Sequence, residues 1–82
     1  VMIEVGVDAS GKYVVNGKTL ADSTVPGISA ALQAAADGGK EPTIVINADA
    51  KATHQSVINI MEASRVAGYT HITFATQASG AN

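Results

Sequence analysis

Catalysis or metal binding by this sequence would depend first on its two histidines, with Ser56 and Asp49 as possible partners. His54 and His71 are its only histidines, and no carboxylate or further histidine stands at the helical or hairpin spacing of a metal site. A catalytic triad could be drawn from Ser56, His54 and Asp49, but residues two apart on a helix point in different directions. The pattern therefore favours neither a metal centre nor an enzyme.

The glycines do not form a phosphate-binding loop. Such a loop needs a strand before the glycines and a helix N-terminus after them, whereas Gly38-Gly39 follow a predicted helix and suit its C-terminal cap. We therefore predict no cofactor.

Asp49 has two possible roles. It stands at the carboxyl end of a predicted strand and just before a predicted helix, where α/β proteins place functional groups. Alternatively, it is a loop carboxylate that accepts backbone N–H bonds near a helix N-terminus, where its charge suits the helix dipole. The second interpretation is favoured, and the first stays open.

Composition bounds the class of protein. The 82 residues suffice for one domain, and the single Phe, two Tyr and absent Trp predict an aliphatic core. The formal charge is −2 and no Lys or Arg residues cluster, which argues against nucleic acid and anionic lipid as direct ligands. No Cys is present, so no disulfide framework is expected.

The first half of the sequence predicts a hairpin followed by a helix. Four β-branched residues alternate from Val1 to Val7, a turn follows at 8–11, and a second strand runs over 12–16 before the Asn16-Gly17 turn. Ser23 or Thr24 can cap a helix near 25–37, with Pro26 in its first turn and glycines after its end.

The second half predicts a strand-helix-strand unit from Thr43 to Thr76. Thr43 to Ala48 forms its first strand, Thr53 caps its helix, Gly68 ends that helix, and the last strand follows. The expected inward stripe of the helix is Val57, Ile60, Met61 and Ser64.

These elements predict an α/β fold of the two-layer α+β type. The order is β-β-α-β-α-β, with a right-handed parallel crossover in the second half and a mixed sheet overall. Every strand alternates, so both helices should cover one face. The open face should carry Met2, Glu4, Thr43, Val45, Asn47, His71, Thr73 and Ala75. Such an apolar open face and a small core also predict a weak homodimer.

The stretch NADAKATHQSVINIMEASRVAGYTHITFATQ, Asn47 to Gln77, resembles the periplasmic domain of the ExbD/TolR family, and SGKYVVNGKTL, Ser10 to Leu20, is similar to its hairpin. Residues 1–76 would then be the periplasmic domain and 77–82 a polar tail. Many relatives have Arg where Asn47 stands. The ending Phe74-Ala75-Thr76 is more similar to the ExbD branch than to the TolR branch.

The resemblance implies a bacterial inner-membrane protein whose soluble part lies in the periplasm. Its single membrane anchor, with the proton-carrying Asp, is expected upstream of this fragment, because the chain begins at Val1 inside a strand; Asp49 is not that residue. The implied partners are an ExbB-like channel subunit, a TonB-like protein and a second copy of the chain.

The resemblance also gives a hypothesis for the site. The domain would engage its TonB-like partner by adding a strand at an exposed sheet edge. The candidate partner-binding residues are Asp49, Lys51, His71, Thr73 and Phe74. Two alternatives stay open: a TolR-like domain that binds peptidoglycan, and a lobe that binds a small ligand.

Overall fold

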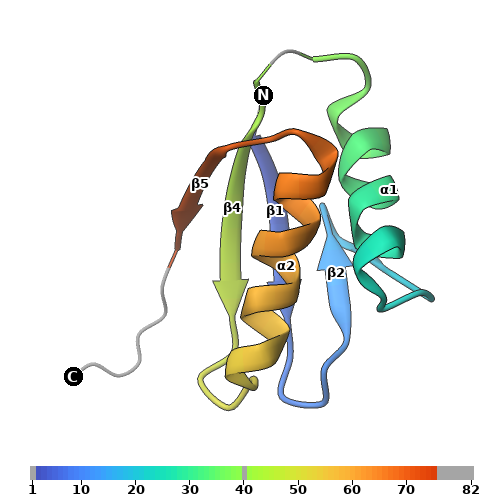
Figure 1. The fold of residues 1–82 in the computed structure, drawn as a ribbon. Coiled ribbons are helices and arrows are strands. Elements are labelled where there is room, and N and C mark those ends of the chain that lie inside the picture. Colours follow the sequence, from blue (N-terminus) through green and yellow to red (C-terminus); the bar gives the residue numbers. More distant parts are fainter. Residues whose placement is uncertain (1, 40, 76–82) are drawn as a thin grey trace.

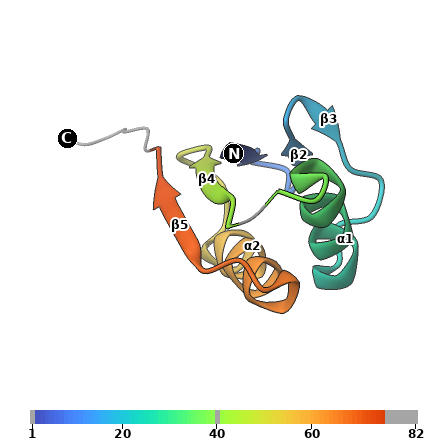
Figure 2. The same cartoon turned by 90° about the horizontal axis from the view of Figure 1, so that it is seen from above.

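The structure is a computed structural model that describes residues 2–39 and 41–75. Its elements are β1 (Met2–Val7), β2 (Tyr13–Val15), β3 (Lys18–Thr19), α1 (Val25–Ala36), β4 (Thr43–Ala48), α2 (His54–Ala67) and β5 (His71–Phe74). The five strands form one sheet in the order β3-β2-β1-β4-β5. Figure 1 shows β2, β1, β4 and β5, and Figure 2 shows β3 beside β2. The predicted two-layer fold with a mixed sheet is thereby confirmed.

The predicted hairpin is confirmed in its pairing. β1 and β2 are antiparallel, with Val5 opposite Val15. The alternating residues Ile3, Val5 and Val7 of β1 are buried as expected, whereas Val1 lies outside the described residues. The aliphatic side chains of β1 therefore form the centre of the core, between β2 and β4.

A third strand follows the Asn16-Gly17 turn and was not predicted. Asn16 and Gly17 have φ values of 51° and 87°, and Val15 pairs with Lys18 across them. Positive φ at both central residues is the type I′ hairpin geometry that Asn-Gly favours. The turn thus starts a second hairpin instead of only ending β2, and β3 escaped prediction because two residues show no periodicity.

Both helices have threonine caps. Thr24, not Ser23, caps α1, because its hydroxyl accepts a hydrogen bond from the N–H of Gly27 at 3.2 Å. Thr53 caps α2 by accepting from the N–H of Ser56 at 3.1 Å, as predicted. At the other end, Asp37 and not a glycine takes the first left-handed position after α1, with φ 48°.

Thr24→Ala is expected to lower the free energy of unfolding by about 1 kcal/mol, because it leaves the N–H of Gly27 without its acceptor. Ser23→Ala is the matched control and should change it by less than about 0.5 kcal/mol. Urea denaturation followed by circular dichroism measures both. Equal losses for the two variants would mean that the cap is misassigned.

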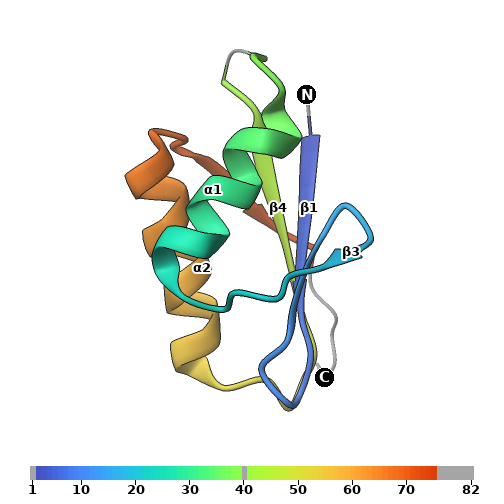
Figure 3. The same ribbon diagram turned by 90° about the vertical axis from the view of Figure 1, so that its right-hand side faces the viewer.

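The helices lie on one face of the sheet, as Figures 2 and 3 show, and this confirms the predicted layering. α1 packs on β1 and β2, while α2 packs on β4 and β1. β4 runs parallel to β1 and β5, so the strand-helix-strand unit has the predicted parallel geometry. β5 ends at Phe74, and Thr76 lies outside the described residues.

Met61 corrects the predicted inward stripe of α2. Met61 is 38% exposed. Ile60 and Ser64 are buried as predicted, and Ser56 and Ala63 are buried in addition to them. The helix presents to the sheet the face centred on Ile60, with Val57 packed partly against the core. Met61 is turned away from the centre of that face, toward β5.

Candidate functional site

β5 forms one end of the sheet and pairs only with β4 among the described residues. The N–H of Ala75 donates to the carbonyl oxygen of Ile46 at 2.9 Å, which directs the backbone of alternate residues toward β4. Because strand backbones alternate, the N–H and C=O groups of Ile72 and Phe74 point away from β4. The outer edge of β5 thus offers two residues whose backbone can pair with another strand.

The helix-facing side of β5 is incompletely covered. Ile72 and Phe74 stand beside Ile44 and Ile46 of β4, yet Phe74 is 54% exposed. Both helices pack mainly on β1, β2 and β4, so this side of β5 lies at the margin of the helical layer (Figure 2). An exposed aromatic side chain at an open sheet edge is a typical feature of a binding surface.

A groove of about 420 Å³ lies between α2 and β5. It is lined by Ile58, Met61, Glu62, Arg65, Tyr69, Thr70 and Ile72. Its two charged residues, Glu62 and Arg65, form an exposed ion pair with each other, so they add no net charge. The groove therefore offers mainly apolar contact beside the outer edge of β5. We call the edge of β5 and this groove together the β5 site.

Sequence reasoning missed the α2 half of the β5 site. Ile58 was assigned no role, and Met61 was assigned to the core. The local pattern does not show whether Met61 lies in the core or beside an open strand, because in either case it would stand one turn from buried residues of the same helix. The exposed Phe74, by contrast, was among the candidates.

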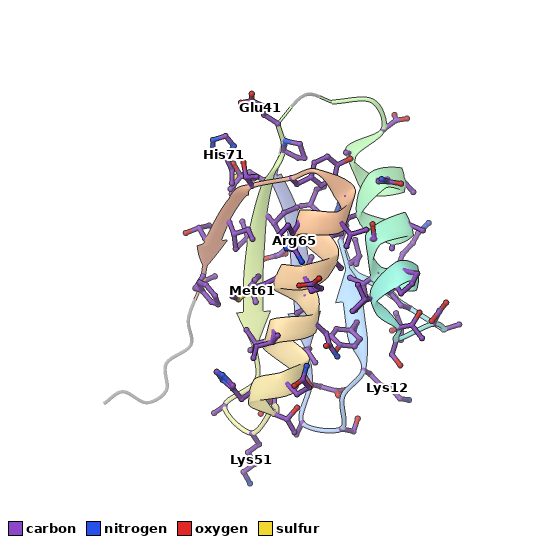
Figure 4. The ribbon with its side chains drawn as sticks, viewed as in Figure 1. Lys12, Glu41, Lys51, Met61, Arg65 and His71 are labelled. Atoms are coloured by element: carbon purple, nitrogen blue, oxygen red, sulfur yellow. The ribbon has the colours of Figure 1, made fainter. Side chains whose placement is uncertain are left out.

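The five predicted partner-binding residues lie at different places. His71 begins β5 opposite Thr43, whereas Asp49 and Lys51 follow the far end of β4. Figure 4 shows Lys51 and His71 at opposite ends of the molecule. His71, Thr73 and Phe74 all belong to β5, with the first two on the open face and Phe74 on the helix face. Their role in binding remains a prediction.

Asp49 makes the contacts of a turn residue. Its Oδ1 accepts from the N–H of Lys51 at 2.8 Å, and its carbonyl oxygen accepts from the N–H of Ala52 at 2.9 Å. Its own N–H donates to the carbonyl oxygen of Val7. These bonds match the loop interpretation of Asp49, since they tie the end of β4 to β1 and shape the link to α2.

A second hollow, also about 420 Å³, lies on the open face of the sheet. Its floor is Gly6, whose cross-strand neighbours are Val14 and Asn47. The complete lining is Glu4, Gly6, Val7, Asp8, Val14, Gly17, Asn47 and Asp49. Its three carboxylates, with no basic residue in the lining, make it suited to a polar or cationic group and unsuited to an anion.

Two aspartates in loops have lowered pKa values. The pKa of Asp8 is lowered chiefly by the backbone N–H of Lys12, which donates to its Oδ1 at 2.9 Å, and then by the Ser10 hydroxyl at 2.8 Å. The pKa of Asp22 is lowered by the hydroxyl and the backbone N–H of Thr24. Each carboxylate holds a loop next to a strand or helix.

We expect stability to fall in acid because of these carboxylates. A pKa that is lower in the folded state gives stability that is complete above the unfolded value, about 3.9, and is lost as the pH falls through the folded value. The variant D8N/D22N should therefore show a flatter loss of unfolding free energy below pH about 4. Urea denaturation at a series of pH values measures this slope. A variant slope as steep as that of the wild type would contradict the assignment.

Within 2–39 and 41–75, no three His, Asp or Glu residues gather in a way that could hold a metal ion. No helix of this part of the chain has the length and apolar character needed to cross a bilayer.

The sequence matches the family model described as biopolymer transport protein ExbD/TolR over residues 1–79. The chain belongs to the ExbD/TolR family. No curated protein sequence matches it significantly. ExbD/TolR proteins are non-enzymatic accessory proteins of biopolymer transport, are anchored to a membrane in the cell envelope, and act with other proteins of a transport complex. The family supports a role in energy transduction for transport.

Proposed function

We propose that residues 1–76 are the periplasmic domain of an energy-transducing subunit of the ExbB-ExbD-TonB type, and that the β5 site binds an extended segment of a TonB-like partner. The observation that carries this proposal is an open strand edge, with backbone groups of Ile72 and Phe74 directed outward, next to an apolar groove. Membership of the family makes a protein partner the natural occupant.

Strand addition explains the shape of the β5 site. Free strand edges in soluble proteins are usually protected by Lys, Pro or a bulge, and the sequence His71–Phe74 contains neither Lys nor Pro. A partner strand would pair its backbone with Ile72 and Phe74, which gives affinity with little dependence on sequence. Its side chains on the helix face would cover Phe74 and Met61, which gives specificity.

The proposed mechanism separates binding from proton transfer. In this mechanism the domain binds its partner reversibly, while a membrane anchor upstream would pair with an ExbB-like channel subunit and carry the proton. The domain must therefore release its partner, and a short edge of four residues suits that purpose. We propose the ExbD branch for this chain on the basis of the ending Phe74-Ala75-Thr76. We also expect the domain to form a weak homodimer.

Titration of the isotopically labelled domain with a peptide from the periplasmic region of a TonB-like protein tests the proposal by NMR. The largest shifts should fall on the amides of β5 and on the groove residues of α2. Phe74→Pro removes the outward N–H and should abolish these shifts, because proline cannot donate. Phe74→Ala is the matched control, since it removes the same aromatic ring but keeps the N–H, and it should weaken binding only in part.

Two outcomes would overturn the proposal. One is a titration in which no β5 amide shifts, and the other is full binding by Phe74→Pro. A dilution series of the free domain separates shifts that come from self-association, because only those change with domain concentration.

The hollow at Gly6 supports a second candidate function. Its carboxylates and the open-face carboxamide of Asn47 could hold a polar ligand or the peptide part of peptidoglycan, which would fit a TolR-like component. A peptidoglycan pull-down with wild type and with Asn47→Leu tests this function. Retention of the wild type and loss of the variant would favour it, whereas retention of neither would leave the β5 site as the functional surface.

A further inference from the structure

Asn16-Gly17 is the only Asn-Gly sequence in the chain, and it forms the two-residue loop between β2 and β3. Both residues are exposed. A Cβ atom placed on Gly17 would meet nothing within 4 Å, and glycine itself has no side chain to shield its own peptide nitrogen. The turn therefore combines a side-chain amide with an unhindered peptide nitrogen next to it.

We infer that Asn16 is a site of spontaneous deamidation. The backbone nitrogen of Gly17 attacks Cγ of Asn16, its proton passes to the departing side-chain nitrogen, and ammonia leaves as a five-membered succinimide forms. Water then opens the ring at either carbonyl and gives aspartate or isoaspartate. Water is the only co-reactant, and no electrons are transferred.

Two hydrogen bonds control when this reaction occurs. The N–H of Asn16 donates to the carbonyl oxygen of Glu4 at 2.8 Å, and Oδ1 of Asn16 accepts from the N–H of Glu4 at 3.0 Å. The second bond ties the side-chain carboxamide of Asn16 to the backbone of β1, which restricts the rotation that would bring Cγ onto the nitrogen of Gly17. Cγ can therefore be attacked only when this end of the β1–β2 pair opens, which links the rate to local opening of the hairpin.

Isoaspartate at position 16 would change the structure of the β3 edge of the sheet. It adds a carbon atom to the main chain within a loop of two residues, and this disrupts the type I′ geometry that aligns Val15 with Lys18. The bond from the N–H of Leu20 to the carbonyl oxygen of Tyr13 would also be lost. β3 would detach, while β5, at the opposite end of the sheet, would keep its pairing with β4.

Incubation of the purified protein at mildly alkaline pH, followed by peptide mapping with mass spectrometry, tests the inference. Asn47 and Asn59 are internal references because Ala48 and Ile60 follow them. We expect conversion at Asn16 to be well advanced before any is detected at the references, and the product to accept a labelled methyl group from a methyltransferase that recognises isoaspartate. Equal conversion at all three positions, or none at Asn16, would overturn the inference.

A second measurement tests whether the hydrogen bond between Asn16 and Glu4 limits the rate of deamidation. A low urea concentration that frays the Glu4–Asn16 end of the β1–β2 pair while the protein stays folded should accelerate conversion at Asn16. Asn16→Gln should abolish the conversion because a six-membered ring closes much more slowly. In the converted protein, NMR shifts should be confined to β2, β3 and the neighbouring end of β1. A rate unchanged by urea would contradict the role of the Glu4 bond, and shifts at β5 would contradict the predicted confinement.

Discussion

Leu32→Ala is expected to lower the free energy of unfolding by about 2–5 kcal/mol. Leu32 is fully buried where α1 packs on the sheet, and its truncation leaves a cavity among side chains such as Ile28. A domain with about 0.05–0.15 kcal/mol of stability per residue would lose much of its total. Urea denaturation monitored by circular dichroism measures the loss.

Gln33→Ala is the matched control for Leu32→Ala. Gln33 is the next residue of α1 and is exposed, so its truncation should change the free energy of unfolding by less than about 0.5 kcal/mol. Similar losses for the two variants would show that α1 does not bury the face described above.

Gly68→Val should have the next largest effect, a loss of about 1–3 kcal/mol. Gly68 ends α2 in the left-handed conformation, with φ 88°, and a β-branched side chain strains there. The chain turns at this residue from α2 into β5, and the N–H of Tyr69 donates to the carbonyl oxygen of Ser64. We therefore expect Gly68→Val to weaken partner binding at the β5 site as well.

Gly68→Asn provides the comparison, because asparagine tolerates the left-handed region far better than valine. It should retain more stability and more binding than Gly68→Val, as measured by denaturation and by the same NMR titration. An equal loss for both variants would contradict backbone strain of the β-branched side chain as the cause, because a Cβ on residue 68 would meet nothing within 4 Å.

The β5 site shows how far a sequence can predict a surface. Phe74 was a candidate, since a strand could be recognised from its alternation. Ile58 and Met61 could not be assigned to the same site, because only the packing of α2 on β4 and β1 decides which of its faces borders β5. Asp49 and His71 were grouped together, yet the parallel register places them at opposite ends of β4.

Local patterns in the sequence were enough to predict both helices and four of the five strands. Alternation defined the strands, threonine caps and Gly68 bounded the helices, and the strand-helix-strand unit of the second half followed from this order. These features depend on contacts between residues that are close in sequence, so local patterns record them.

Three features depend on the tertiary structure: the open edge at β5, the side of α2 that borders this edge, and the pairing of Lys18–Thr19 as a fifth strand. The physical reason is that these features depend on contacts between distant residues. A strand has the same alternating pattern whether it lies inside a sheet or at its edge, and a two-residue strand has no pattern at all. The open edge of β5 exists because the chain places β4 next to β1 and leaves no further described strand to cover it.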